Sequence, residues 1–264
     1  MAPKHHKNST YVTALARGFE ILRCFDAARP ELSTMDIAKL TGLPQSTVWR
    51  LCNTLVELGC LLRQAGSDKL SIGLGLLGYG YAALPSLDLD ELAEMQMKRL
   101  ADELHAGVSL SIRDKHEMLI VKRVRGQGGL VSAGRIGSHV PIVVSAAGWA
   151  YLAALPHGQR ESLAGELQRQ AGLDWPRLHG LIDAEIRRYG DKGFILNIGT
   201  YRPEINYAAV PIPIGDTIYT LHCSGLASML PAELLQAEVG PSLVELAKRM
   251  RVALSLSPAV LFTR

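Results

Sequence analysis

The amino-acid sequence predicts an α+β protein in which an N-terminal winged helix-turn-helix precedes a larger domain of strands and helices. Residues 33–59 contain two short helical patterns joined at a glycine, and a short hairpin pattern follows them directly. From residue 105 onward the pattern changes to strands, then helices, then an antiparallel group of strands with a closing helix. Strands and helices that are segregated in this way are typical of α+β domains.

The size and charge of the chain fit this division. Its 264 residues are 48% hydrophobic, which is enough for real cores, and the formal net charge is +3. Residues 1–80 hold nine Lys/Arg and six Asp/Glu, whereas the remaining residues hold 19 of each. All the net positive charge therefore lies in the winged-helix part, and this is the sign that phosphate binding requires.

The first helix is expected from Ala14 to Phe25. Its apolar residues recur at near-helical spacing, so we expect them to form the third side of a small core under the helix-turn-helix. They are Leu15, Phe19, Leu22 and Phe25.

The next helix begins with a capping box, in which Ser33 and Asp36 satisfy backbone N–H groups of the first turn. Ile37 and Leu40 give this helix its apolar side. Gly42 then supplies a left-handed corner at little steric cost.

The following helix has Pro44 in its first turn, where a missing N–H does no harm. Its apolar residues share one face: Val48, Leu51, Leu55 and Leu58. The opposite face is short of charge and rich in side chains that hydrogen-bond to phosphates and base edges. It predicts a DNA-recognition helix. The expected contacts are Gln45, Ser46, Thr47, Trp49, Arg50 and Asn53.

Two short strand patterns, 61–64 and 69–72, flank a glycine-containing turn. A hairpin directly after the recognition helix indicates the winged form of the motif, and Arg63 and Lys69 are placed to reach phosphates from this wing. Two amphipathic helices with a glycine corner also occur in all-α proteins that never bind DNA. The hairpin and the local positive charge are what favour DNA binding.

Other features exclude several classes of protein. Four cysteines are scattered with no CxxC pair, which is typical of reduced, cytoplasmic proteins without a disulfide frame or a zinc site. The N-terminus is basic but lacks an apolar segment, so we expect no signal peptide. Residues 140–155 are uncharged but shorter than a membrane span, and we expect a buried strand end leading into a buried helix. We expect no cofactor, no metal and no membrane partner.

We place the winged helix at 11–73, a linker helix at 74–88 and the second domain at 89–257. Asp88 or Asp90 is expected to cap a longer helix that reaches Leu104. In the second domain, strands are expected at 107–113, 117–124, 130–136, 193–199, 205–214 and 217–224. Helices are expected at 146–155, with Ser145 as the cap, at 158–170 and at 175–189. A helical tail begins at Pro231, is broken at Gly240-Pro241 and continues to about residue 254.

Taken together, several stretches resemble the IclR-type family of bacterial transcription regulators, over about residues 11–256. They are LARGFEILRCF, STVWRLCNTLVELG, LSIGLGLLGYG, IGSHVPIVVSAAGWAYLAALP and the run into AAVPI. The resemblance implies a winged helix that dimerises, a linker helix, and a GAF-like α/β domain that binds a small organic acid or aromatic metabolite. The implied partners are a double-stranded DNA operator, this effector, and further copies of the chain in a dimer or a dimer of dimers.

The resemblance also implies effector-binding positions. Ala146 and Ala147 match the start of the family's pocket helix, where backbone N–H groups bind a carboxylate. The family signature is matched at Gly193, but this chain has Asn197, Thr200 and Tyr207 at its other three places. His222 and Ser224 match two pocket-facing positions on the last strand.

Alternative interpretations stand beside these assignments. Tyr207 is equally a packed aromatic residue, His222 a core histidine, and Asn197 a strand-end residue. An enzyme is disfavoured, because His222 and Cys223 are adjacent on a strand, so they point to opposite faces, and no HExxH, GxSxG or glycine-rich phosphate loop occurs. A ligand sensor or scaffold without DNA binding is the remaining alternative.

Overall fold

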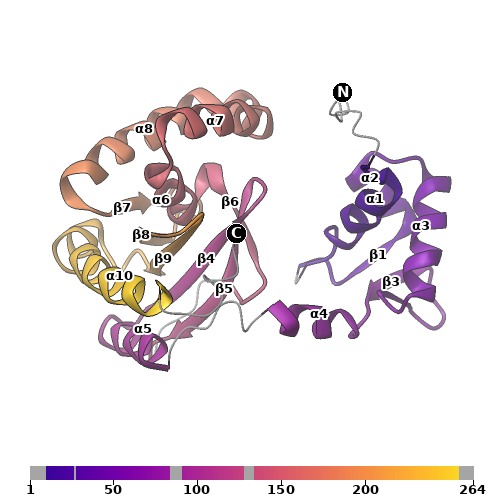
Figure 1. Ribbon diagram of the computed structural model, residues 1–264, viewed down its shortest axis with the longest axis horizontal. Helices are drawn as coiled ribbons and strands as arrows, with labels where there is room; N and C mark the ends of the chain where they lie inside the picture. Colours follow the sequence, from indigo (N-terminus) through magenta and orange to yellow (C-terminus); the bar gives the residue numbers. More distant parts are fainter. Residues whose placement is uncertain (1–9, 27, 84–90, 128–133, 256–264) are drawn as a thin grey trace. The chain divides into compact units, whose positions relative to one another are not determined.

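A computed structural model describes residues 10–26, 28–83, 91–127 and 134–255 of the chain. They form two compact units, which we call the N-terminal unit, up to residue 83, and the C-terminal unit, from residue 91 (Figure 1). The fold is the predicted α+β arrangement, with a helix-turn-helix unit before an α/β unit.

The N-terminal unit contains four helices and a three-stranded antiparallel sheet in the order β1-β3-β2. Its elements are α1 (Thr13–Leu22), β1 (Glu31–Ser33), α2 (Thr34–Thr41), α3 (Gln45–Glu57), β2 (Leu61–Arg63), β3 (Lys69–Ile72) and α4 (Leu76–Ala83). Both predicted wing strands are confirmed. The third strand, β1, was not predicted, because its three residues are too few to show a pattern; Leu32 on β1 pairs with Leu70 on β3.

The corner between α2 and α3 forms as predicted. Ser33 Oγ accepts a hydrogen bond from the Asp36 backbone N–H at 3.2 Å, and the Asp36 carboxylate accepts one from the Ser33 N–H at 3.1 Å, which completes the capping box. Gly42 ends α2 in the left-handed conformation, with φ +69°. Pro44 is the N-cap residue of α3, directly before the first turn in which it was predicted to lie.

The core of this unit lies between α1, α2, α3 and the sheet, but four predicted core residues do not belong to it. Its buried residues are Ile21, Cys24, Leu32, Ile37, Val48, Cys52, Leu55, Leu61 and Leu70. Leu15, Phe19, Leu40 and Leu58 are 62%, 59%, 49% and 70% exposed. The spacing of apolar residues predicts which side of a helix is apolar. It does not predict which of two adjacent rows of side chains on that side faces the core. In α3, Cys52 continues the inner row between Val48 and Leu55, so Leu58 lies outside it.

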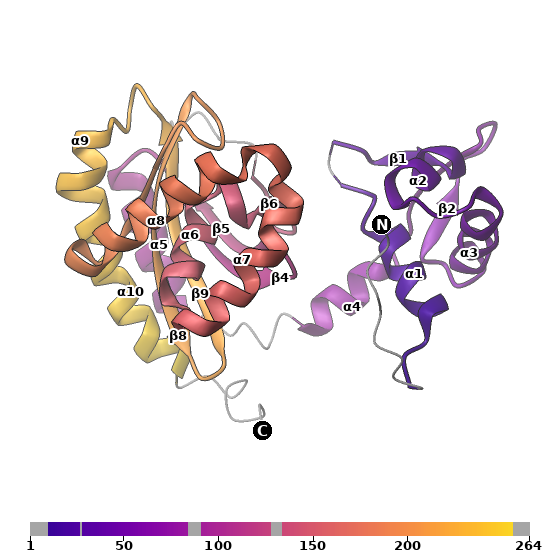
Figure 2. The same ribbon diagram turned by 90° about the horizontal axis from the view of Figure 1, so that it is seen from above.

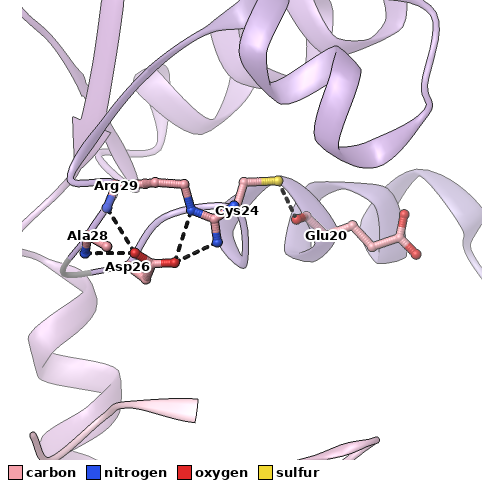
Figure 3. Close-up of polar contacts among 5 residues, drawn as sticks. All are labelled: Glu20, Cys24, Asp26, Ala28 and Arg29. Atoms are coloured by element: carbon pink, nitrogen blue, oxygen red, sulfur yellow. Dashed lines mark hydrogen bonds and ion pairs between the residues drawn. The ribbon is translucent and has the colours of Figure 1, made fainter. Parts of the chain in front are cut away.

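Helix α1 ends at Leu22, three residues earlier than predicted. The N–H groups of Cys24 and Phe25 donate to Ile21 and Leu22, three residues back, so the α-helical bonding is already lost there. Asp26 follows, and its Oδ1 accepts backbone hydrogen bonds from Ala28 and Arg29, both at 2.8 Å, while its Oδ2 accepts one from the Arg29 side chain (Figure 3). These bonds close a turn that competes with continuation of the helix.

The C-terminal unit is built on a six-stranded antiparallel sheet in the order β6-β5-β4-β9-β8-β7. Its strands are β4 (Gly107–Asp114), β5 (Glu117–Arg125), β6 (His139–Pro141), β7 (Ile195–Ile198), β8 (Ile205–Ile214) and β9 (Thr217–Leu226). Its helices are α5 (Glu91–Glu103), α6 (Ala146–Ala154), α7 (His157–Ala171), α8 (Trp175–Lys192), α9 (Ala232–Leu234) and α10 (Gly240–Ser255).

Helices cover both faces of this sheet (Figures 1 and 2). One face packs on α5 and α10 through a cluster that includes Met97, Leu110, Leu221, Cys223 and Leu243. The other face packs on α6, α7 and α8 through a second cluster, which includes Trp149, Leu167, Ile182, Ile195 and Ala209. We call these the α10 face and the α6 face.

Three details of this unit differ from the sequence-based expectation or fall outside it. Residues 134–136 are not a strand, and 130–133 lie outside the described residues. The tail is not broken at Gly240-Pro241; instead a π-helical turn at Leu235–Val239 leads directly into α10 and accommodates the proline. The last part of the predicted linker, with the caps Asp88 and Asp90, also lies outside the described residues.

Among the described residues, no helix is both long and apolar enough to span a membrane. All four cysteines are free thiols.

Candidate functional site

The outer face of α3 carries the six side chains predicted to contact DNA. Four are exposed: Gln45, Ser46, Trp49 and Arg50. Two are half-buried at its edge: Thr47 and Asn53. Trp49 keeps 55% of its surface accessible although it lies next to the buried Val48. Helix α3 therefore points the side chains of Trp49, Arg50 and Gln45 outward. Its inner row is buried in the core: Val48, Cys52 and Leu55.

The wing is tied to α3 and to β1 by polar contacts. The Arg63 guanidinium donates to Asn53 Oδ1, which joins the first wing strand to the recognition helix. Lys69 Nζ lies 3.9 Å from a carboxylate oxygen of Glu31, a neighbour that the sequence did not reveal because β1 was not predicted. Arg63 is thus positioned beside the α3 surface, whereas the charge of Lys69 is partly balanced.

In the C-terminal unit, strand register brings together four of the predicted effector residues. Asn197, Tyr207 and Ser224 are direct neighbours across β7, β8 and β9. His222 lies two residues before Ser224, so its side chain points to the same face. That face is the α6 face, because Ala209, the cross-strand neighbour of His222, packs in the α6–α8 cluster.

Asn197 also connects this row to the start of α6. It is 1% exposed, and its Nδ2 donates to the backbone oxygen of Val144 at 2.9 Å. Ser145 follows and caps α6 by accepting from the Gly148 N–H at 3.1 Å. Ala146 and Ala147, the first two residues of α6, are buried. All six predicted effector residues therefore lie on the α6 face or on the helix that covers it.

His222 and Cys223 point to opposite faces, as their adjacency on β9 predicts, since Cys223 belongs to the cluster on the α10 face. Burial, reinforced by the charge of Arg123, lowers the pKa of His222 to about 3. Burial raises the pKa of Cys223 to about 12. A neutral imidazole and a neutral thiol on opposite faces have neither the geometry nor the ionisation of a nucleophile–base pair.

Sequence reasoning missed four polar residues on the α6 face: Ser109, Ser111, Arg123 and Thr220. Ser109 pairs with both His222 and Arg123, and Ser111 pairs with Thr220. The two serines and Thr220 are 0% exposed. The available signal was the alternation of serine with Val108 and Leu110 on the predicted strand.

We call the polar side chains on this face the polar cluster. Its members are Ser109, Ser111, Arg123, Asn197, Thr220, His222 and Ser224. Several of its buried atoms have no hydrogen-bond partner among the described residues: Ser111 Oγ, Asn197 Oδ1, Thr220 Oγ1 and His222 Nδ1. Buried polar atoms are normally paired, so this group suits a polar ligand.

Comparison with known proteins identifies the family of both units. The family model for the IclR helix-turn-helix domain matches residues 14–65, and the model for the bacterial transcriptional regulator IclR C-terminal domain matches residues 81–177. The HTH-type transcriptional regulator TsaQ1/TsaQ2 of Comamonas testosteroni is 30% identical over 239 residues, which cover 89% of this chain and 86% of that protein.

Solved structures show the same relationship. An IclR family transcriptional regulator from Brucella abortus is 35% identical and superposes with a TM-score of 0.87 over 96% of each chain. An IclR homologue from Microbacterium hydrocarbonoxydans, complexed with 4-hydroxybenzoate, shares the fold at 22% identity, with a TM-score of 0.65 over 94% of this chain and 99% of the homologue. The chain therefore belongs to the IclR family of DNA-binding transcription regulators.

Proposed function

We propose that this regulator binds a double-stranded DNA operator through the outer face of α3 and the wing, and that a small organic acid or aromatic effector bound in the C-terminal unit changes its operator affinity. The proposal rests on two features seen together. Helix α3 has an outward polar face, and the C-terminal unit has a buried polar cluster in which several atoms have no hydrogen-bond partner among the described residues.

The surface of α3 supports specific base contacts. Arg50 and Gln45 are exposed, and their side chains are the types that bind guanine and adenine edges in the major groove. Trp49 offers apolar contact to a thymine methyl group or to the sugar-phosphate backbone. Arg63, held beside α3 by Asn53, suits a phosphate contact from the wing.

The α6 face supports effector binding. Backbone N–H groups at the start of α6, near Ala146 and Ala147, favour an anion. The hydroxyl of Ser224 and the ring of Tyr207 lie in the neighbouring row, so they suit the polar and flat parts of a small ligand. The complex of an IclR homologue with 4-hydroxybenzoate is consistent with a ligand of this class.

Exposed apolar side chains in the N-terminal unit support a homodimer. They include Val12, Leu15 and Phe19 at α1, which are 59–62% exposed, and Tyr79 and Tyr81 on α4, which are 75% and 67% exposed. Leu15 and Phe19 are four residues apart and share one face of α1, and an exposed apolar face of this kind is typical of an interaction surface. A dimer also lets two recognition helices bind two half-sites. Association of C-terminal units into a dimer of dimers and a cytoplasmic location belong to the same proposal.

The test begins with fragmented genomic DNA, from which the purified full-length protein selects bound fragments. Fluorescence anisotropy then measures affinity for the selected fragment with and without a panel of carboxylic acids. We expect specific retention and at least one acid that changes affinity by about 5–150-fold, the usual range of allosteric coupling. If no fragment is retained above competitor DNA, the chain is a sensor or scaffold without DNA binding. If no acid changes the affinity, the effector part of the proposal is wrong.

A further inference from the structure

A guanidinium lies within the polar cluster of the C-terminal unit. Arg123 on β5 is directly opposite Ser109 on β4, and its Nη1 donates to Ser109 Oγ at 3.1 Å. The next row toward the end of the sheet contains Gly107, which pairs with Ser224 on β9. The neighbour of the Arg123 side chain on this side is therefore Gly107, which has no side chain.

Two glycines provide the space that the guanidinium occupies. A Cβ atom at Gly107 would lie 2.5 Å from Arg123 Nη2 and 3.4 Å from Ser224 Oγ. A Cβ atom at Gly134 would lie 3.1 Å from Arg123 Nη1. The guanidinium thus extends over Gly107 toward Ser224, and larger residues at either position would displace it.

The charge of Arg123 is costly where it lies. Burial lowers the pKa of Arg123, and the nearby charge of Arg125 lowers it further. Arginine nevertheless stays protonated in proteins, so the fold holds a partly desolvated cation on this face. A carboxylate beside it would offset that cost, and the planar guanidinium matches a carboxylate with two parallel hydrogen bonds.

The rest of the cluster is uncharged. His222 is 5% exposed and has a free Nδ1 among the described residues, while Asn197 is 1% exposed and has a free Oδ1. Asn197 Oδ1 can accept a hydrogen bond from a hydroxyl group, and the neutral imidazole of His222 can donate or accept one, so both can bind an uncharged polar group without adding charge. Tyr207 lies between Asn197 and Ser224 in one cross-strand row, and its ring centroid is 6.4 Å from that of Tyr201. Aromatic rings in this position favour a flat ligand.

We propose, as an extension of the effector function above, that the effector is a carboxylate whose charged group pairs with Arg123, while Asn197 and His222 bind an uncharged polar group of the same molecule. The anion is then assigned to a side chain on β5, and this replaces its assignment in the proposed function to the backbone N–H groups at the start of α6. Arg123 is then the residue that makes the site select acids over their neutral analogues.

The experiment compares acids with matched amides on the full-length protein. Benzoate and 4-hydroxybenzoate, each beside its neutral amide, are tested by thermal shift and by titration calorimetry. Wild-type protein should bind an acid more tightly than its amide. In Arg123→Gln this preference should disappear, with a loss of about tenfold or more in acid affinity and a smaller change for the amide. Arg125→Gln, which removes the same charge from an exposed position on the same strand, should keep the preference.

Two further variants keep the test decisive if Arg123→Gln does not fold. Gly107→Ala retains the guanidinium but displaces it, so it should weaken acid binding while leaving amide binding nearly unchanged. Ala147→Trp fills the start of α6 and should weaken acid and amide alike. If acids bind Arg123→Gln as tightly as wild type, the inference is wrong and the effector function stands. If neither acid binds wild type, the inference is wrong. The effector function is then judged separately, by whether any acid of the panel changes operator affinity.

Discussion

Arg50 is exposed on the outer face of α3, where a long side chain can reach the floor of the major groove. We predict that Arg50→Ala weakens operator binding by about 1–3 kcal/mol, the usual value of a bidentate contact to guanine. Arg50→Lys should recover little of this loss, because a lysine cannot form the fork of two hydrogen bonds. Fluorescence anisotropy on the selected operator measures both variants. Full recovery by lysine would show that Arg50 contacts a phosphate instead of a base.

At the scale of single residues, the sequence was informative for exposed polar side chains and much less so for buried ones. The outward residues of α3 were found because a helix with an apolar stripe must have an opposite face. Arg123 and Thr220 were missed, because a charged or hydroxyl residue on a strand is ordinarily exposed. Only the register of β4, β5 and β9 shows that they share one buried face with Ser109.

Helix α2 shows how spacing can identify an element and still misassign its faces. Ile37 is 0% exposed, whereas Leu40, predicted on the same side, is 49% exposed. We predict that Ile37→Ala lowers the free energy of unfolding of the N-terminal unit by about 2–5 kcal/mol, the usual cost of truncating a buried aliphatic side chain. Leu40→Ala should change it by less than about 0.5 kcal/mol. Chemical denaturation followed by circular dichroism compares the two. Equal losses would place Leu40 in the core after all.

The junction before α10 depends on a close helix–ring contact. A Cβ atom at Gly240 would lie 2.5 Å from the Phe194 ring, so the helix start packs directly against it. We predict that Gly240→Ala lowers the free energy of unfolding of the C-terminal unit by about 1–3 kcal/mol through overpacking.

The matched control for this prediction is Gly180→Ala in α8. Nothing lies within 4 Å of a Cβ atom there, so alanine should stabilise the helix by about 0.5–1 kcal/mol. Thermal unfolding of the two variants should therefore shift in opposite directions. A stabilised Gly240→Ala would mean that Phe194 moves aside without cost.

Most elements could be predicted, because long apolar periodicity and turn residues mark helices and hairpins locally. The capping box at Ser33 and the cap at Ser145 are local signals of this kind, and both are confirmed. Strand β1 and the π-helical turn at Leu235–Val239 were not predictable in the same way. The former exists only because β3 pairs with it, and the latter leads into α10 and accommodates Pro241 without a break in the helix.

At the scale of the whole molecule, operator binding depends on how many copies of the chain act together. One winged helix offers a small contact area, whereas two linked recognition helices bind with an affinity that exceeds either alone by about 10²–10⁴. The exposed apolar residues of α1 are the part of the N-terminal unit whose burial would stabilise such a pair, because each fully buried side chain of this size contributes roughly 1.5–3 kcal/mol.

We therefore predict that Phe19→Glu, which places a charge on a side chain that is 59% exposed, weakens dimerisation without unfolding the chain. Sedimentation velocity should show a shift toward monomer, and operator affinity should fall by about 10²-fold or more, because one half-site is lost. Leu173→Glu is the control, since Leu173 is fully exposed in the C-terminal unit and should leave both measurements unchanged. A Phe19→Glu protein that remains dimeric and binds the operator tightly would move the dimer interface away from α1.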